Sequence, residues 1–148
     1  MGSEGHVPTC MEIARGLATH FNDDALERMP GDLAEHRLLV AEDDGRIVGF
    51  LTVLEGDRQA EISWMGVRRE LHRRGIGRTL MAMAETLLIR RGVRKLIVRT
   101  LADTVVYEPY EATRRFYESM GFRLLEVIDP YTGWSPGNPC SVYVKDLG

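Results

Sequence analysis

Two glycines and three arginines stand close together near the middle of the chain, where they could bind a phosphate group. Gly75 and Gly77 permit unusual backbone angles and let a ligand approach the backbone without a Cβ in the way. The free N–H groups at the start of a helix, with the positive end of its dipole, bind anions such as phosphate. Arg73, Arg74 and Arg78 add positive charge at the same point. These residues therefore predict a site for a phosphorylated ligand.

Two widespread phosphate-binding patterns do not fit this segment. A P-loop needs Lys followed by Ser or Thr after its last glycine, whereas Gly77 is followed by Arg78 and Thr79. A dinucleotide fingerprint needs three spaced glycines, whereas here only Gly75 and Gly77 are present. Gly-x-Gly alone is weak evidence, because turns at helix starts often carry glycine. Other parts of the chain must therefore identify the ligand.

Two segments together resemble a known family. His72-Arg73-Arg74-Gly75-Ile76-Gly77 is similar to the pyrophosphate loop of the GNAT superfamily of acetyl-CoA-dependent N-acetyltransferases, in which Gln or Arg, two free positions, Gly, one free position and Gly or Ala follow each other. His72 departs from the pattern at its first position, although that loop acts mainly through backbone amides. The run at residues 112–122 resembles the second signature, a helix with Phe-Tyr near its end followed by Gly-Phe. The resemblance covers roughly residues 37–147.

The resemblance implies where acetyl-CoA binds. In the family, two parallel strands splay apart, and the pantetheine arm bonds the exposed strand edge as an added strand would. Here that edge comprises Met65, Gly66 and Val67, whose backbones bind while their side chains are expected to pack in the core. The pyrophosphate would meet a neighbouring loop. That loop consists of His72, Arg73, Arg74, Gly75, Ile76, Gly77 and Arg78.

The resemblance also implies two catalytic side chains. Tyr117 occupies the Phe-Tyr position, where the phenol, with a pKa of about 10, can protonate the departing thiolate, whose pKa is about 8 to 9. Glu61 aligns with a general-base glutamate of the histone-acetylating branch, and by alternation it shares a strand face with Ser63 and Met65. The Met65 amide is the expected oxyanion donor. The alternatives are a Tyr117 ring that only packs and a Glu61 carboxylate that is only solvated.

Hydrophobic periodicity predicts the elements that position these residues. Residues 60–67 form a strand, residues 76–91 a helix with Gly92 as its C-cap, and residues 95–100 a second strand. A strand–helix–strand crossover predicts that the two strands lie parallel.

The flanking elements are predicted in the same way. Residues 11–21 form a helix with Thr9 as N-cap and Glu12 completing a capping box. A second helix begins at Asp23 or Asp24, is interrupted at Pro30-Gly31 and resumes to residue 36. The remaining predictions are strands at 38–41 and 46–54 around an Asp-Asp-Gly turn, a loop at 101–110, a helix at 111–120, a strand at 122–128, a loop at 129–139 and a strand at 141–145. Residues 1–8 are expected to be flexible, and the strand that precedes the first helix in the family to be missing or vestigial.

These elements predict a mixed α/β (α+β) fold in a single domain at residues 1–148. It has a central, mostly antiparallel sheet with one splayed parallel strand pair, flanked by helices, as the resemblance also implies. A chain of 148 residues is long enough to bury one substantial core and too short for two ordinary domains.

Composition excludes several classes of function. A net charge of −3 with 44% hydrophobic residues is typical of a soluble globular protein that does not bind nucleic acid or membrane. Cys10 and Cys140 form no Cys-x-x-Cys pair, so we expect a reducing, cytoplasmic setting. The histidines have no metal-ligand spacing, and no metal is expected. The most apolar run, at 47–54, is far shorter than the roughly 20 residues that span a bilayer.

The predicted function is transfer of an acetyl group from acetyl-CoA, its cosubstrate, to a primary amine by direct attack in a ternary complex. The alternative is a non-catalytic acyl-CoA-binding sensor or regulatory domain. The acceptor is a small-molecule or peptide amine; the use of longer acyl groups and the oligomeric state, a homodimer included, stay open. The loops at 101–110 and 129–139 carry carboxylates and aromatic rings without Lys or Arg, which favours a cationic amine unless these are ordinary polar loops. Those residues are Asp103, Tyr107, Glu108, Tyr110, Asp129, Tyr131 and Trp134.

Overall fold

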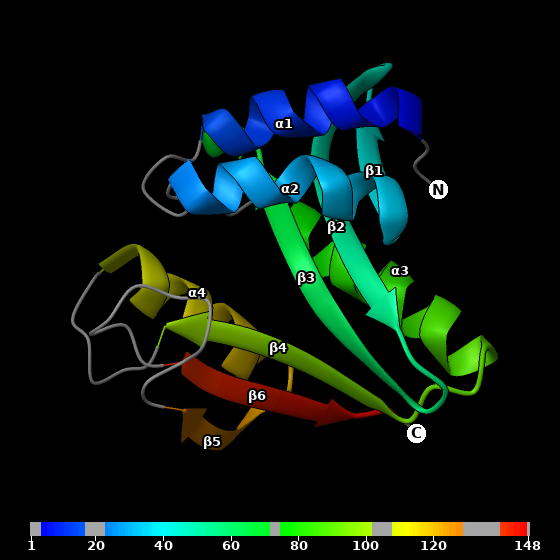
Figure 1. The fold of residues 1–148 in the computed structure, drawn as a ribbon, viewed down its shortest axis with the longest axis vertical. Coiled ribbons are helices and arrows are strands. Elements are labelled where there is room, and N and C mark those ends of the chain that lie inside the picture. Colours follow the sequence, from blue (N-terminus) through cyan, green and yellow to red (C-terminus); the bar gives the residue numbers. More distant parts are fainter. Residues whose placement is uncertain (1–3, 17–22, 72–74, 102–107, 129–139, 148) are drawn as a thin grey trace.

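The computed structural model describes residues 4–16, 23–71, 75–101, 108–128 and 140–147. Within these ranges, six strands form one sheet in the order β1-β2-β3-β4-β6-β5 (Figure 1). The strands are β1 (Arg37–Asp43), β2 (Arg46–Glu55), β3 (Gln59–Val67), β4 (Lys95–Leu101), β5 (Arg123–Ile128) and β6 (Cys140–Asp146). The pair β3–β4 is parallel, and every other neighbouring pair in this sheet is antiparallel. The predicted fold class is therefore confirmed.

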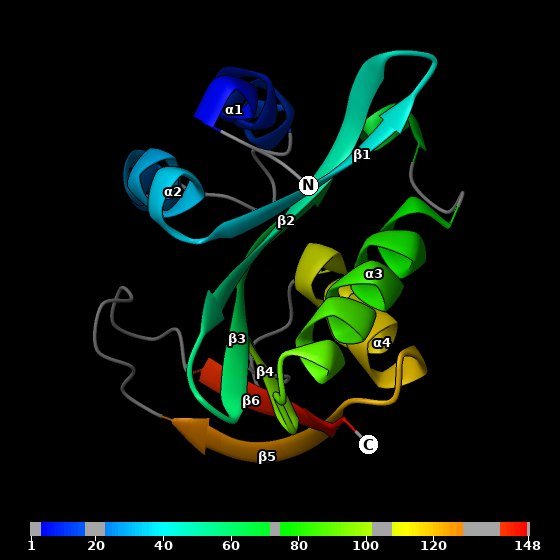
Figure 2. The same cartoon turned by 90° about the vertical axis from the view of Figure 1, so that its right-hand side faces the viewer.

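Helices cover both faces of the sheet. On one face lie α1 (Val7–Arg15) and α2 (Asp23–Glu35), and on the other lie α3 (Ile76–Arg90) and α4 (Glu108–Ser119), as Figure 2 shows. Short 3-10 turns precede α1 at Glu4–His6 and α3 at Arg69–Leu71. The predicted strand–helix–strand crossover is confirmed, because α3 connects β3 to the parallel strand β4.

Two hydrophobic clusters lie on opposite faces of the sheet. The larger one joins α3 and α4 to the sheet through fully buried residues such as Leu51, Leu80 and Leu96. The smaller one joins α1 and α2 to β1 and β2 around Met29 and Phe50. Alternating residues of the same strand therefore supply different cores, which fixes the register of each strand.

The first hairpin has the predicted turn. Asp44 and Gly45 both have positive φ, at 51° and 76°, and they connect β1 to β2. Positive φ at both central residues is the geometry that suits two-residue hairpins, and Asp-Gly adopts it at low cost. The strand predictions on either side are confirmed.

Several predicted helix boundaries were wrong. The helix α1 begins at Val7 with His6 as N-cap and ends at Arg15, before the predicted residue 21. Thr9 therefore lies inside it and cannot form the predicted capping box with Glu12. Pro8 occupies the first turn, where a missing N–H costs nothing, and residues 4–8 are therefore helical or 3-10 rather than loose. The helix α2 continues through Pro30 instead of breaking there. The helix α4 begins at Glu108 rather than at the predicted residue 111.

Candidate active site

The parallel pairing between β3 and β4 ends partway along both strands. Their register covers only Gln59↔Lys95 through Ile62↔Val98. Beyond it, β3 stays paired with β2 as far as Val67, and β4 stays paired with β6 as far as Leu101. Each strand is thus held on its outer side while the inner sides diverge, as Figure 1 shows. Met65 and Gly66 lie past the last parallel pair.

A β-bulge lies at this divergence. Thr52 pairs with Trp64, and Val53 pairs with Ile62, so Ser63 is an extra residue in β3. A bulge turns the residues that follow it onto the other face of the sheet. Trp64 accordingly packs in the α1–α2 cluster and Met65 in the α3–α4 cluster. The expectation that Met65 shares a face with Glu61 and Ser63 was therefore wrong.

The start of α3 is open to an anion. Its N-cap is Gly75, with φ 82° and no hydrogen bond from a capping side chain, and the first turn has no acidic residue. The carbonyl of Gly75 accepts bonds from the backbone N–H and the hydroxyl of Thr79, both at 3.0 Å. A helix leaves its first amides without intrahelical acceptors, here those of Ile76, Gly77 and Arg78. The predicted site residues His72, Arg73 and Arg74 lie outside the described residues.

Two glycines allow close approach around this helix start. A Cβ on Gly77 would lie 3.3 Å from Cζ of Phe116 on α4. A Cβ on Gly49 of β2 would lie 3.2 Å from the carbonyl oxygen of Gly66 and from side-chain carbons of Ile76 and Leu80. Gly49 thus lets α3 seat against the sheet beside Gly66. The sequence analysis missed this residue, although a glycine inside a run of strand-forming residues is a signal for close backbone approach.

Arg78 connects the start of α3 to the end of α4. Its guanidinium donates to the hydroxyl of Ser119 at 3.1 Å and to the sulfur of Met120 at 3.6 Å. The side chain is exposed, so a positive charge stands beside the uncapped helix start.

Tyr117 lies on α4 within the larger core. Its ring meets those of Phe116 and Phe122 edge to face, both with centroids 5.5 Å apart, and only 5% of the residue is exposed. Burial raises the pKa of the Tyr117 phenol well above its ordinary value. The hydroxyl therefore keeps its proton at neutral pH.

Glu61 forms an ion pair with Arg99 of β4. The side chains are 30% and 31% exposed, and Arg99 follows the last parallel pair of β4 directly. The Nε of Arg99 is buried and has no hydrogen-bond partner among the described residues. Glu61 thus lies in the parallel register one position before it ends, and its carboxylate contacts a permanent cation that the pattern of a single strand does not indicate.

A chain of hydrogen bonds runs from the bulge to α2. The hydroxyl of Ser63 lies 2.7 Å from the hydroxyl of the fully buried Thr52 and 2.8 Å from Nδ1 of His36. Nε2 of His36 lies 3.7 Å from a carboxylate oxygen of Asp32, whose other oxygen accepts from Nε1 of Trp64 at 2.8 Å. In the sequence, His36 stands at the end of the second predicted helix and has no metal-ligand spacing, and no local pattern connects it to Ser63.

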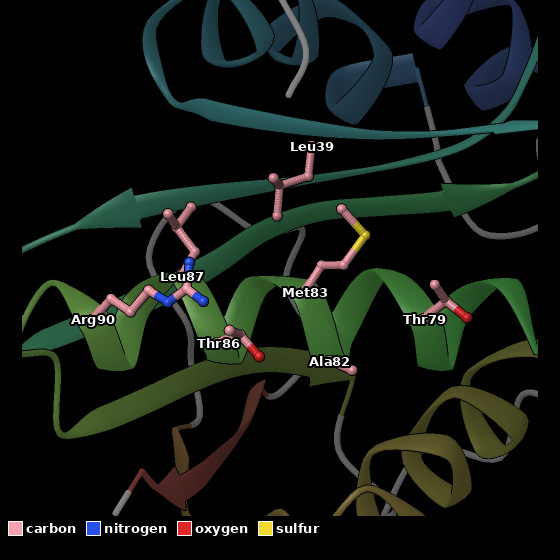
Figure 3. Close-up of a pocket in the computed structure, with 7 residues that line it drawn as sticks. All are labelled: Leu39, Thr79, Ala82, Met83, Thr86, Leu87 and Arg90. Carbon is pink, nitrogen blue, oxygen red and sulfur yellow. The ribbon is translucent and has the colours of Figure 1, made fainter.

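A shallow groove of about 460 Å³ lies elsewhere, between β1 and the outer surface of α3. Figure 3 shows Met83 and Leu87 extending from α3 toward Leu39. The lining residues are Leu39, Thr79, Ala82, Met83, Thr86, Leu87 and Arg90. It contains none of the predicted site residues.

Two searches of the described ranges were negative. No group of three or more His, Cys, Asp or Glu side chains there could hold a metal ion. None of the helices in these ranges combines the length and the hydropathy that crossing a membrane requires.

Comparisons with known proteins complete this description. Residues 34–124 match the profile of the Acetyltransferase (GNAT) domain. No significant match was found among curated protein sequences.

Among solved structures, the fold is similar to that of a GNAT-family protein from Desulfovibrio desulfuricans, with a TM-score of 0.80 and 18% identity over 97% of this chain and 94% of that one. It is also similar to the ribosomal-protein-S18-alanine N-acetyltransferase from Escherichia coli, with a TM-score of 0.76 and 17% identity over 97% and 89% of the two chains. A third similar structure is the PaiA N-acetyltransferase from Thermoplasma acidophilum in complex with coenzyme A, with a TM-score of 0.74 and 17% identity over 98% and 95%. At this identity the structures support the fold, and the domain profile, which spans more than half of the chain, shows the family. The chain belongs to the GNAT acetyltransferase family.

Proposed function

We propose that this protein is an N-acetyltransferase that transfers the acetyl group of acetyl-CoA to a primary amine by direct attack in a ternary complex. One observation carries the proposal. The register of β3 with β4 ends at Ile62↔Val98, and the uncapped start of α3 follows closely in the chain. A strand edge and a helix start are complementary to an amide-bearing arm that ends in a pyrophosphate.

The residues around the divergence fit coenzyme A. The backbones of Met65, Gly66 and Val67 would bond the pantetheine arm. The amides of Ile76, Gly77 and Arg78 would bind the pyrophosphate, because the open space around Gly75 and the absence of an acidic residue in the first turn favour an anion. His72, Arg73 and Arg74 are proposed to complete that loop. Acetyl-CoA supplies the acetyl thioester.

Tyr117 is proposed as the general acid and the Met65 amide as the oxyanion donor. Because a buried tyrosinate is costly, the phenol would donate to the thiolate only as the C–S bond breaks. It would then recover a proton from the nitrogen that has just been acylated. Tyr117 therefore begins and ends each turnover with its phenolic proton in place.

Glu61 is proposed as the carboxylate that receives the ammonium group of the acceptor, and it is the general-base candidate that the family resemblance implies. Its ion pair with Arg99 holds the carboxylate at the divergence and occupies part of its hydrogen-bonding capacity.

The acceptor is proposed to be a small-molecule or peptide amine. Two of the similar structures are N-acetyltransferases by name, and one of them acts on the alanine of a ribosomal protein. The preference for a cationic acceptor rests on the sequence alone. The residues that predict it lie outside the described part of the structure, in the ranges 102–107 and 129–139 and in the side chains of Glu108 and Tyr110. A cytoplasmic setting is proposed as well, since Cys10 is a buried free thiol.

The decisive experiment measures release of free coenzyme A from acetyl-CoA with a broad panel of amines and peptides. Turnover with any acceptor, with mass spectrometry showing an acetylated nitrogen, would establish the activity. Calorimetric titration of coenzyme A is run in parallel. Tight binding without turnover on the whole panel would instead favour the non-catalytic sensor.

A further inference from the structure

The hydrogen bonds at the bulge include an imidazole, a group that can accept a proton on one nitrogen and donate one from the other. His36 joins α2 to β1, and its backbone N–H bonds the carbonyl of Asp32 at 2.7 Å. Only 13% of its side chain is exposed. Nδ1 meets the hydroxyl of Ser63 at 2.8 Å, and Nε2 faces Asp32 at 3.7 Å. A histidine with one nitrogen hydrogen-bonded to a hydroxyl and the other within ion-pair distance of a carboxylate has the order of groups found in a general base with an orienting partner.

The hydroxyl pair can serve both charge states of His36. When the imidazole is neutral with its proton on Nε2, Ser63 donates to Nδ1 and Thr52 donates to Ser63. When the imidazole is charged, Nδ1 donates to Ser63 and Ser63 donates to Thr52. In both states Nδ1 of His36 and the hydroxyls of Ser63 and Thr52 stay linked, so protonation of His36 requires that the two hydroxyl groups rotate.

The position of Ser63 connects this chain to the proposed reaction. Ser63 is the bulged residue between Ile62, where the parallel pairing ends, and Met65, the proposed oxyanion donor. It lies on the same sheet face as Glu61, opposite the core that packs against α3. A hydroxyl at this point links the diverging strands to the imidazole of His36.

We propose that His36 accepts the proton of the acceptor's ammonium group through the hydroxyl of Ser63, with Asp32 as a positioning residue; this rests on the proposed N-acetyltransferase activity. The ammonium gives one proton to Ser63 as Ser63 gives its own to Nδ1 of His36. The amine is then neutral and forms the C–N bond. Asp32 stabilises the imidazolium, which returns its proton to solvent on the side of Asp32, whose side chain is 35% exposed. Glu61 attracts the ammonium and need not be protonated.

The charged groups around His36 are consistent with this role. From α2, Asp32 supplies the facing carboxylate, while Arg28 lies over the Trp64 ring, 5.8 Å from its centroid. From the sheet, Glu61 and Arg99 on the same face neutralise each other. The neighbouring Arg37 pairs with Glu55 and not with His36. Among these described groups, Asp32 is the one within ion-pair distance of the imidazole.

The test is the pH dependence of kcat/KM in the wild type, His36→Gln and Ser63→Ala, each with two acceptors of similar size. One acceptor has a pKa of about 10, and the other an amine pKa below about 7, which needs no deprotonation. For the basic amine at pH 7 we expect each variant to lose roughly 10²-fold in kcat/KM and to recover as pH rises. For the weakly basic amine we expect little loss. The matched control is His6→Gln, which changes a histidine that takes no part in the hydrogen bonds of Ser63. It should retain the wild-type pH profile.

Other outcomes overturn the proposal. Equal losses for both acceptors at all pH values would mean a structural role, and unchanged activity would remove His36 from the reaction. Glu61 is the base if Glu61→Gln abolishes the fall of kcat/KM at low pH while His36→Gln and Ser63→Ala both keep it. An acetylated Ser63 found by mass spectrometry would replace the relay with a covalent route. If His36→Gln fails to fold, as judged by thermal unfolding and coenzyme A binding, Ser63→Ala decides alone. Absence of wild-type turnover with every amine would contradict the proposed function itself.

Discussion

Arg99 of β4 and Glu61 of β3 form an ion pair across the point where the two parallel strands separate. Both side chains are about one third exposed, so the pair is partly screened by solvent and its effect on stability is small. Because of its position, we expect the Glu61–Arg99 pair to matter more for binding of the amine acceptor than for the stability of the fold. The pair fixes a carboxylate at the mouth of the divergence, where a charged amine would enter.

Glu61→Gln should therefore raise KM for a cationic amine by roughly tenfold and change kcat much less, because the carboxylate acts by charge attraction. Steady-state kinetics at low and high salt check this, and the difference from wild type should shrink as salt increases. Glu126→Gln, at an exposed position of β5, is the control. A large fall in kcat with unchanged KM would contradict the charge-attraction role.

Tyr117→Phe removes only a hydroxyl from a ring that packs against Phe116 and Phe122. We expect kcat to fall by about 10²-fold, with unchanged coenzyme A affinity and nearly unchanged thermal stability, because the phenol is proposed to protonate the leaving thiolate. Kinetics and calorimetry on the same preparation check the three quantities. An unchanged kcat would remove the hydroxyl from the chemistry.

Gly77→Val should weaken coenzyme A binding by roughly tenfold or more, whereas His72→Ala should have little effect. The new side chain would meet Phe116, from which even a Cβ lies only 3.3 Å away, and it would obstruct the amides at the start of α3. Calorimetric titration measures both variants, and thermal unfolding separates lost binding from lost packing between α3 and α4. Normal binding by a folded Gly77→Val protein would place the pyrophosphate elsewhere.

Glu55 joins three elements, because it pairs with Arg37 at the start of β1 and with Arg91 at the end of α3. Burial alone would raise the pKa of the Glu55 carboxyl, but hydrogen bonds from Arg37 and Arg91 lower it below its ordinary value. The stabilisation is therefore present above the ordinary carboxyl pKa of 4.5 and is lost as pH falls through the lowered value. Glu55→Gln should lower the free energy of unfolding by about 1 to 2 kcal/mol at pH 7.

Denaturant unfolding of the wild type and Glu55→Gln between about pH 3 and pH 7 measures this difference, which should narrow toward the acid end. A difference that stays constant over this range would show that the carboxylate charge is not responsible.

The sequence by itself determined the order and type of most elements. Helical periodicity located α3, and runs of β-branched and apolar residues located β3 and β4. Asp44-Gly45 determined the first hairpin, since few other residue pairs adopt positive φ twice in succession. The glycines and the Phe-Tyr and Gly-Phe pairs predicted the family, which the domain profile confirms.

Local signals were less reliable at helix ends. Thr9 with Glu12 and the pair Pro30-Gly31 are ordinary start and stop signals, yet neither ends up at a helix boundary. Packing of α1 and α2 against Phe50 decides where these helices lie, which local propensity does not record.

Only the tertiary structure decided which side chains meet at the candidate site. One extra residue, Ser63, reverses the face of everything after it in β3, and the register with β2 that creates this bulge is a non-local property. The contact of Ser63 with His36 spans 27 positions in the chain, and that of Glu61 with Arg99 depends on a parallel register formed across a helix. Sequence periodicity reports burial within one element. It carries no information on which residues two elements bring within hydrogen-bonding distance, because that is fixed by the packing of the whole sheet.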